Sequence, residues 1–243
     1  MNITWRELEF FLTRLKSLPV SKSISLGDKG FCVSTGCDIE SWVFYPKRVK
    51  NPEIVERVIN FFKDEKVSFM WPVYDGGEKV LEDSGLLYAG SLTGMIYEPG
   101  TSNSNAAQES SNINSDDWAR TAWHGFGGSV DDVPGNYFAL VKSFDDAPEF
   151  SLHLHKAEEN LEKFAGSFML VNEPDSTGVY YFATVPEMRR KGIANSMMKE
   201  ICKLSNGKKI LLQATPAGLP FYKNFGFEEL CKIPVYSDSN DVF

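Results

Sequence analysis

In the first half of the chain, apolar residues recur at helical spacing in some stretches and run continuously in others. Residues 5–15 show spacings of three and four and predict a helix that ends before Pro19. A second helix is predicted at residues 52–62, with Pro52 in the first turn, where its missing N–H does no harm. A short helix is expected at residues 77–83. The apolar runs predict strands at residues 30–34, 41–45 and 68–73, and a final strand or hairpin at residues 85–97.

The second half shows the same mixture of patterns. Helical residues begin at about Asp117, and a turn or short helix is expected over residues 157–162. Two further helices are predicted at residues 191–204, before the Asn206-Gly207 stop signal, and at residues 218–225. Strands are predicted at residues 137–144, 150–156, 168–172, 178–185, 209–214 and 229–236. Strands outnumber helices and alternate with them only near the end, which indicates an α+β fold of mixed α/β layers.

A polar segment separates the two halves. Residues 99–117 read PGTSNSNAAQESSNINSDD, and nine of these nineteen residues are Ser or Asn. Such a segment cannot bury enough apolar surface to offset its ordering entropy, so we expect a mobile linker. The sequence therefore predicts one domain at residues 1–98 and a second at residues 118–243.

The two predicted domains share an order of elements at an offset of 141 residues. Gly85 and Gly226 each follow a short helix that comes after a strand, and the same offset aligns Arg48 with Arg189. We interpret this as two copies of one supersecondary plan. The agreement is one of pattern and not of residue identity, so chance similarity is the alternative.

Composition and charge narrow the class of protein. The chain has 243 residues, of which 42% are hydrophobic and 13% aromatic, which supplies a core and excludes a disordered chain. No apolar run approaches the roughly 20 residues needed to cross a bilayer, and the charges of Arg6-Glu7 interrupt any signal sequence. The net charge of −8 disfavours nucleic acid as a partner. We expect a cytoplasmic protein, and the sequence does not indicate its oligomeric state.

Cysteine and histidine offer little chemistry. The four cysteines form no C-x-x-C pair, so we expect ordinary buried thiols without a disulfide framework or a thiolate metal site. His153 and His155 alternate on one strand face and could bind a metal, but no third ligand has suitable spacing. We interpret them as part of a polar strand face and predict no metal site.

The turn after the strand that ends at Val185 is the most informative segment. The next helix begins inside a basic turn that contains Gly192, which lets a ligand approach the backbone closely, while Ala194 keeps the first turn narrow. A helix N-terminus presents N–H groups without intrahelical partners and a positive dipole end. Three cations surround the same point: Arg189, Arg190 and Lys191. The turn therefore predicts a phosphate or pyrophosphate site, with a solvated basic helix start as the alternative.

The motifs around this turn resemble those of the GNAT superfamily of N-acetyltransferases. Arg189-Arg190-Lys191-Gly192-Ile193-Ala194 matches the Q/R-x-x-G-x-G/A motif of that family, and Val185-Pro186-Glu187 matches the turn before it. Phe221-Tyr222 and Gly226-Phe227 match its aromatic-Tyr-x-x-x-Gly-Phe block. The detailed match covers about residues 168–230. The resemblance implies the GNAT fold, in two tandem copies if the repeat is genuine.

The resemblance also implies roles for individual residues. Backbone groups of three residues would pair with the pantetheine arm of acetyl-CoA like an added strand: Ala183, Thr184 and Val185. Arg189 and the N–H groups of the following residues would hold the pyrophosphate: Arg190, Lys191, Gly192, Ile193, Ala194 and Asn195. A main-chain N–H near Val185 would polarise the thioester carbonyl. Tyr222 would be the catalytic acid that protonates the departing thiolate; the alternative is a tyrosine that only packs.

The sequence departs from the family pattern in two places. Thr215 and Gly218 stand where the family often has Asn and Ala, which puts one side-chain bond to the cofactor arm in doubt. The strand at residues 178–185 contains no Asp, Glu or His, so a general base must lie elsewhere, act through water or be unnecessary. Trp123-His124, before a glycine-rich turn, lies where the family builds its acceptor pocket. We expect this pair to contact the substrate; a packed aromatic beside the turn is the alternative.

These features predict an N-acetyltransferase that transfers acetyl from acetyl-CoA directly to a primary amine. The acidic composition favours a small cationic acceptor, and protein amines are an alternative. The offset aligns Gly192 with Asn51 and Tyr222 with Leu81, so the N-terminal half should bind no coenzyme. The competing hypotheses are an acetyl-CoA sensor without catalysis and an interaction module that binds no coenzyme.

Overall fold

A computed structural model describes residues 3–100, 113–157 and 160–239 of the chain. The chain divides into two compact units, each described here by itself. Unit 1 holds the residues up to Met95, together with Gln213–Asn224 and the chain from Glu229 onward; unit 2 holds Ile96–Leu212 and Phe225–Glu228. Within the described ranges, no helix combines the length and the apolar character that crossing a membrane requires.

Unit 1 contains the helices and strands of the N-terminal half and the last strand of the chain. Its helices are α1 (Ile3–Lys16), α2 (Pro52–Glu65) and α3 (Glu78–Asp83), and the short helix α7 (Leu219–Phe225) lies largely in it. Its strands are β1 (Lys22–Gly27), β2 (Gly30–Ser34), β3 (Trp42–Phe44), β4 (Trp71–Pro72), most of β5 (Leu87–Tyr97) and most of β10 (Glu228–Ser237).

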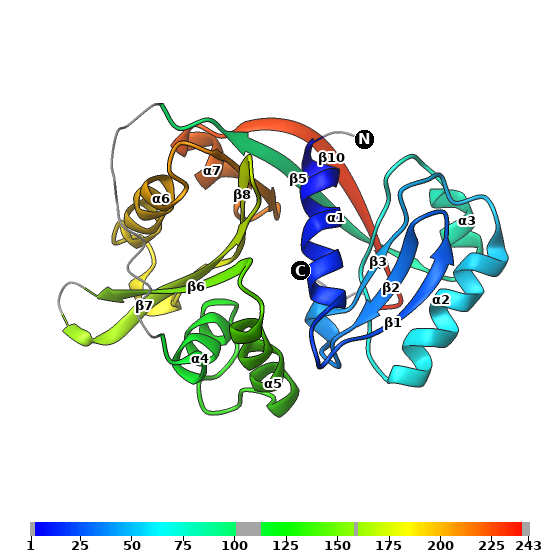
Figure 1. Ribbon diagram of the computed structural model, residues 1–243, viewed down its shortest axis with the longest axis horizontal. Helices are drawn as coiled ribbons and strands as arrows, with labels where there is room; N and C mark the ends of the chain where they lie inside the picture. The colour runs from blue at the N-terminus through cyan, green and yellow to red at the C-terminus, as the bar shows by residue number, and fades with distance from the viewer. Residues whose placement is uncertain (1–2, 101–112, 158–159, 240–243) are drawn as a thin grey trace. The chain divides into compact units, whose positions relative to one another are not determined.

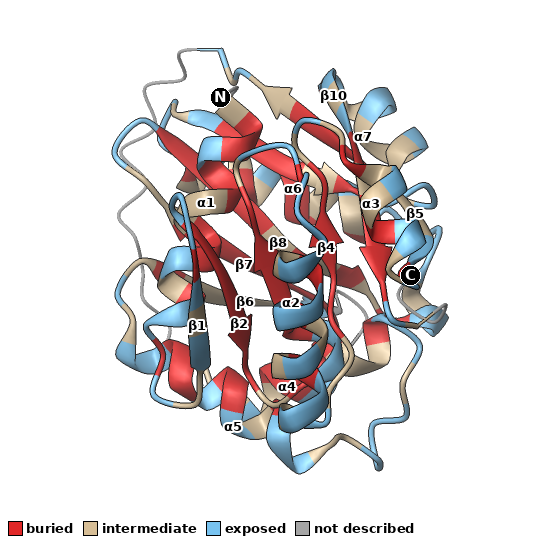
Figure 2. Ribbon diagram, turned by 90° about the vertical axis from the view of Figure 1, so that its right-hand side faces the viewer, coloured by how far each residue is buried: buried red, intermediate tan, exposed pale blue. Residues whose placement is uncertain are grey.

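The strands of unit 1 form the middle layer between helices (Figure 1). β1, β2 and β3 are antiparallel neighbours, and the N–H of Val43 donates to the carbonyl of Met70 at 2.9 Å, which brings the segment before β4 beside β3. α1 covers one face and α2 with α3 the other. β2 is buried along its length, whereas α2 turns exposed residues outward (Figure 2). Apolar residues of α2, such as Val55 and Phe62, are buried against this layer.

The last strand of the chain completes the sheet of unit 1. β10 lies between β4 and β5 and pairs antiparallel with β4, with Val235 opposite Pro72 and Tyr236 opposite Trp71. Val235 and Trp71 are fully buried. The hydroxyl of Tyr236 donates to the Glu82 carboxylate at 2.8 Å. A segment from the C-terminal end of the sequence is therefore part of the core of unit 1.

Unit 2 contains the remaining elements. Its helices are α4 (Ser115–Gly125), α5 (Gly135–Ser143) and α6 (Ile193–Leu204), with the 3₁₀ turns η2 (Phe144–Asp146) and η3 (Pro186–Met188). Its strands are β6 (Phe150–Ala157), β7 (Asn160–Asn172), β8 (Ser176–Thr184) and most of β9 (Lys209–Ala214), in the order β9-β8-β7-β6. β6, β7 and β8 are antiparallel, and β8 and β9 are parallel.

Helices cover both faces of the unit 2 sheet, with α4 and α5 on one side and α6 on the other (Figure 1). Trp118 of α4 is fully buried and its indole N–H donates to the carbonyl of Phe168 in β7 at 3.2 Å. Met197 of α6 is fully buried on the opposite side. The sheet is therefore the middle of three layers, as the mixed α/β prediction required.

The order of elements repeats along the chain. Three strands, a helix, a strand, a helix and a strand occur as β1 to β5 with α2 and α3, and again as β6 to β10 with α6 and α7. The first residues of α2 and α6 are 141 positions apart, as are those of α3 and α7 and those of β5 and β10. This is the offset seen in the sequence.

One predicted strand is wrong. Residues 137–144 form helix α5 and the start of η2, because the buried residues Tyr137, Leu140, Val141 and Phe144 recur every three or four positions. The prediction also missed β1, which has few apolar residues. A turn or short helix was expected at residues 157–162. Instead, residue 157 ends β6 and residues 160–162 begin β7, while residues 158–159 lie outside the described residues. Most of the linker, residues 101–112, lies outside the described residues.

The two units do not coincide with the predicted domains at residues 1–98 and 118–243. Segments 213–224 and 229–243 follow the linker in sequence but belong to unit 1. The division of the sequence at the linker therefore stays a prediction. The compact units of the structure are divided differently, because unit 1 also contains segments that follow the linker.

Candidate coenzyme and acetyl-transfer site

β8 changes direction at a bulge before it reaches the basic turn. Its pairing with β7 shifts register between Ser167 and Met169, and Tyr181 has a positive φ of 49°, which a side chain of this size rarely adopts. The parallel register with β9 covers only Ser176 to Gly178, before the bulge. The segment of β8 beyond the bulge therefore lies outside that parallel register.

The turn after β8 leads into the N-terminus of α6. Gly192 has a φ of 84° and is the N-cap of α6, and a Cβ at this position would meet no atom within 4 Å. Ser196 provides the first N–H with a helical acceptor, the carbonyl of Gly192 at 3.0 Å. The N–H groups of the first turn, Ile193 to Asn195, precede it and have no acceptor within the helix. The turn thus combines N–H groups that lack helical acceptors with open space beside Gly192, as a phosphate site requires.

Arg190 and Lys191 extend the positive charge of this turn. Arg190 has a φ of 61°, which turns the chain toward Gly192, and both side chains are exposed. The ammonium of Lys191 lies 3.7 Å from the sulfur of Met188. Two predicted cations are therefore accessible beside the N–H groups of α6.

Arg189 is placed differently from its two neighbours. Its Nη2 donates to the carbonyl of Gly125 at 2.9 Å and its Nε to the carbonyl of Thr184 at 3.2 Å. The N–H of Val185 is likewise engaged, since it donates to the carbonyl of Ala165 at 3.0 Å. An oxyanion donor near Val185 must therefore be a different N–H of this segment.

Trp123 and His124 lie at the C-terminal end of α4 and are both half-buried. The Trp123 ring packs beside Gly128, where a Cβ would come within 2.1 Å of the indole nitrogen, and lies 5.4 Å from the Tyr137 ring. Gly125 lies so close to β8 that a Cβ there would come within 2.6 Å of the Ala183 Cβ. These contacts match the packed-aromatic alternative, and substrate contact by this pair stays a hypothesis.

His124 uses both ring nitrogens. Its Nδ1 lies 3.0 Å from the carbonyl of Gly128 and its Nε2 lies 3.0 Å from the Glu187 carboxylate. Both neighbours are acceptors, so the imidazolium form satisfies both contacts. The hydrogen bond to Gly128 and then the carboxylate of Glu187 raise the pKa of His124, while partial burial and Arg189 oppose them.

The raised pKa of His124 predicts a pH dependence of stability. The imidazolium is favoured in the folded state, so its contribution is complete at acidic pH and is lost as the pH rises through the folded-state pKa. We expect the melting temperature of wild type to exceed that of His124→Gln by roughly 1–3 °C near pH 5.5, with the difference shrinking toward pH 8. Glu187→Gln serves as the control and should flatten this profile; a difference that grows with pH would contradict the assignment.

Tyr222 lies on α7 in unit 1, whereas the basic turn belongs to unit 2. Its ring is partly buried, and desolvation raises the pKa of the phenol above its ordinary value, so it holds its proton at neutral pH. A Cβ at Gly218 would lie 3.1 Å from the Tyr222 ring, so glycine leaves room for it. The hydroxyl of Thr215 accepts from the N–H of Gly218 at 3.3 Å, which uses Thr215 in the turn before α7.

The other candidate ligands have ordinary partners. The His153 ring stacks on Phe168 at 4.6 Å and its Nε2 lies 2.7 Å from the Ser151 hydroxyl, and burial lowers the pKa of His153. His155 faces Glu200 at 3.4 Å. Across the described part of the chain, no three His, Cys, Asp or Glu side chains are grouped to hold a metal. The four cysteines are free thiols.

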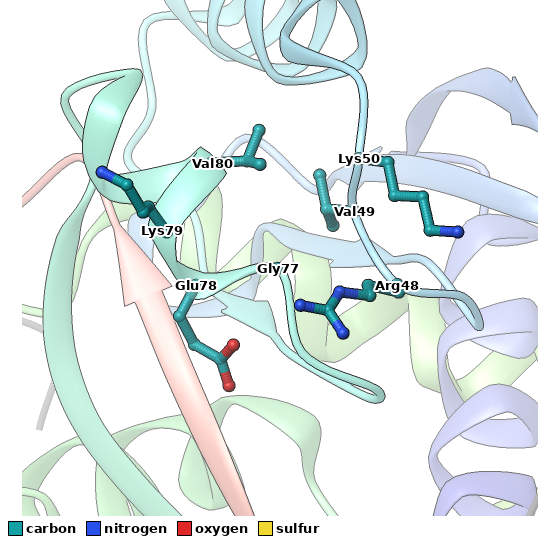
Figure 3. Close-up of a pocket in the computed structure, with 7 residues that line it drawn as sticks. All are labelled: Arg48, Val49, Lys50, Gly77, Glu78, Lys79 and Val80. Carbon is teal, nitrogen blue, oxygen red and sulfur yellow. The ribbon is translucent and has the colours of Figure 1, made fainter.

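Unit 1 has a pocket of about 410 Å³ between residues 48–50 and the start of α3 (Figure 3). Arg48 and Lys50 are the offset counterparts of Arg189 and Lys191. Here, however, Asn51 caps α2: its side-chain oxygen accepts from the N–H of Glu53 at 2.9 Å, and Pro52, the first residue of the helix, has no N–H. The first turn of α2 therefore lacks the open donors that α6 presents.

Within unit 2, the residues after β8 bring N–H groups and two exposed cations to the N-terminus of α6, as an anion site requires. Unit 2 thus places an anion-binding turn after a bulged strand, within three α/β layers. Two signals of this site escaped sequence reasoning. Neither the bulge at Tyr181 nor the contacts of Glu187 and Arg189 follow from residue spacing.

Comparison with known proteins identifies the class more closely. Residues 151–229, about a third of the chain, match the acetyltransferase (GNAT) domain family. Among solved structures, similarity extends to a GCN5-related N-acetyltransferase from Kribbella flavida, with a TM-score of 0.65, 16% identity and coverage of 98% of this chain and 96% of that one. A functionally unknown conserved protein from Staphylococcus epidermidis gives a TM-score of 0.56 at 10% identity, covering 81% and 83%.

A tandem GNAT protein from the clavulanic acid biosynthesis pathway is also similar, with a TM-score of 0.54, 10% identity and coverage of 94% of this chain and 86% of that one. No curated protein matches the sequence. The structural similarities show the GNAT fold, and the family match lies on the segment that carries the basic turn and α7. Residues 151–229 therefore match a GNAT acetyltransferase domain, and the fold of the chain is that of GNAT structures.

Proposed function

We propose that the protein transfers the acetyl group of acetyl-CoA directly to a primary amine, with a small cationic amine as the favoured acceptor. The observation that carries this proposal is the open N-terminus of α6, where Gly192 has a positive φ and free space in front of it. The cradle would consist of Gly192, the N–H groups of the first turn of α6 and the charges of Arg190 and Lys191. Protein amines are a second class of acceptor to be tested.

Other groups of the chain would bind the pantetheine arm and protonate the leaving thiolate. The backbone of Ala183 to Val185 would bind the pantetheine arm on the side of β8 that lies beyond its register with β9. Acetyl-CoA supplies an activated thioester, so holding it beside the amine provides much of the rate. Tyr222 would give its proton to the thiolate that leaves.

Replacing the phenol tests the role of Tyr222. Tyr222→Phe keeps the ring that packs near Gly218 and removes only the hydroxyl. We expect turnover to fall about tenfold or more, with acetyl-CoA affinity unchanged, because general acid catalysis is lost. The matched control is Tyr88→Phe, an exposed tyrosine on β5. Turnover is measured by steady-state kinetics and acetyl-CoA affinity by calorimetry. Equal turnover in Tyr222→Phe and wild type would show that Tyr222 is not the general acid.

The proposed reaction is tested by thermal melting with acetyl-CoA, followed by a screen for thiol release with polyamines, amino acid derivatives, aminoglycosides and peptides. Coenzyme at about 100 times its Kd should stabilise the protein by about 2.7 kcal/mol. Stabilisation without thiol release from any amine would favour a sensor. No stabilisation would exclude the proposed function.

The tandem arrangement is part of this proposal. The repeated element order and its offset support two copies of one plan, of which the first has a capped α2 and Leu81 in place of the tyrosine. We propose that this copy binds no coenzyme. Calorimetry should give one acetyl-CoA per chain, and a stoichiometry of two would overturn this point.

A further inference from the structure

We propose that Arg189 is a positioning residue that fastens the C-terminal turn of α4 to the end of β8, rather than a ligand of the coenzyme phosphates. The effect on catalysis rests on the proposed function, whereas the effect on the turn does not. The turn consists of residues 124–128. The side chains of Arg189, His124 and Glu187 connect it to the chain after β8.

The two bonds of Arg189 reach different elements. Nη2 donates to the carbonyl of Gly125, the last residue of α4, at 2.9 Å, and Nε donates to the carbonyl of Thr184, the last residue of β8, at 3.2 Å. The last carbonyls of a helix lack intrahelical donors and attract cations. One planar guanidinium therefore satisfies an orphan carbonyl of α4 and also joins α4 to β8.

α4 and β8 are packed tightly where Arg189 joins them. A Cβ on Gly125 would come within 2.6 Å of the Ala183 Cβ, so α4 touches β8 through the bare backbone of Gly125. Both residues are buried. A loss of the Arg189 bonds would let the end of α4 move from the strand that precedes the coenzyme cradle.

A second connection runs parallel to the first. Nε2 of His124 lies 3.0 Å from the Glu187 carboxylate, and Nδ1 lies 3.0 Å from the carbonyl of Gly128. His124 and Gly125 are adjacent on α4, and Glu187 is two residues before Arg189. The side chains of Arg189 and His124 therefore both connect one turn of α4 to the segment that leads into the cradle.

Three backbone amides, those of residues 126–128, report the stability of the turn. The N–H of Phe126 donates to Ala122 at 3.1 Å, that of Gly127 to His124 at 3.0 Å, and that of Gly128 to Trp123 at 3.0 Å. Amide hydrogens in such bonds exchange with solvent only when the turn opens. Their exchange rates can be measured without any coenzyme.

The experiment compares Arg189→Met and Arg189→Lys with wild type by amide exchange and kinetics. Lysine keeps the positive charge but has a single ammonium, which cannot replace a fork that spans two carbonyls. We expect exchange at residues 126–128 to accelerate about tenfold or more in both variants. Turnover should fall about 10- to 100-fold, because misplacement alone can cost that much, while acetyl-CoA Kd changes less than threefold.

Arg120→Met is the matched control. Arg120 also lies on α4 and donates from its guanidinium to a backbone carbonyl, that of Val130 at 2.8 Å, but it has no bond to β8. We expect this variant to leave exchange at residues 126–128 within threefold of wild type. An equal acceleration in Arg120→Met would mean that loss of any arginine on α4 loosens the turn, and would overturn the proposal.

A phosphate ligand would behave differently. Arg189→Met would then weaken acetyl-CoA binding tenfold or more, Arg189→Lys would largely restore it, and exchange at residues 126–128 would stay as in wild type; this result would overturn the proposal. If wild type bound no acetyl-CoA, the proposed function would fail, and amide exchange would still decide the role of Arg189. If Arg189→Met did not fold, Arg189→Lys, which keeps the aliphatic stem and the charge, would decide it.

Discussion

Gly192→Asn is expected to reduce acetyl-CoA binding by about 100-fold at a small cost in stability, about 1 kcal/mol or less. Asparagine is among the few residues that tolerate a positive φ, and it is a preferred N-cap whose side chain accepts from the first N–H groups of a helix. Asn51 does this at the start of α2. The same side chain at residue 192 would occupy the donors of α6 and fill the open space in front of them.

A large effect on binding beside a small effect on folding makes this prediction specific. Calorimetry should show the loss of affinity, while the melting temperature should fall no further than it does in Gly207→Asn. Gly207→Asn is the control, because Gly207 has a φ of 79° and also has open space around it, but follows the other end of α6. Undiminished acetyl-CoA affinity in Gly192→Asn would refute the cradle.

Val235→Asp is expected to unfold unit 1, at a cost of about 4 kcal/mol or more. Val235 is fully buried on β10 opposite Pro72, and an unpaired carboxylate there loses its hydration without gaining a partner. Denaturant unfolding should show the loss. Cys32, fully buried in the core cluster that contains Tyr236, should become accessible to a thiol reagent.

Leu230→Asp is the matched control for this variant. Leu230 lies on the same strand but is 40% exposed, so the same substitution there should change stability by less than about 0.5 kcal/mol. If Cys32 is as well protected from the thiol reagent in Val235→Asp as in wild type, β10 does not belong to the core of unit 1. The contrast between the two variants separates burial from a general intolerance of β10 to charge.

Much of the architecture could be predicted from local patterns. The helices at α2 and α6 followed from apolar spacing with a proline or glycine at their starts, and the GNAT motifs identified the class of enzyme. The helix α5 was missed because Tyr137, Leu140, Val141 and Phe144 are aromatic or branched, which favours strands by composition although their spacing is helical. Composition outweighed periodicity in that prediction.

Other features depend on contacts distant in sequence. Nothing local to residues 228–237 indicates that this strand pairs with β4 rather than within its own half, because register is chosen by the whole sheet. The basic turn was predicted as three cations around one phosphate site. All three side chains are exposed, but Arg189 donates to the carbonyls of Gly125 and Thr184, because α4 packs beside the end of β8.

The position of β10 between β4 and β5 has a consequence for how the protein is made. A ribosome delivers the N-terminal half first, yet that half lacks an inner strand of its sheet until β10, residues 228–237, has emerged. Vectorial synthesis therefore cannot finish unit 1 ahead of the rest of the chain. For the same reason, the first hundred residues expressed as a separate fragment would expose the unpaired sides of β4 and β5 and tend to aggregate.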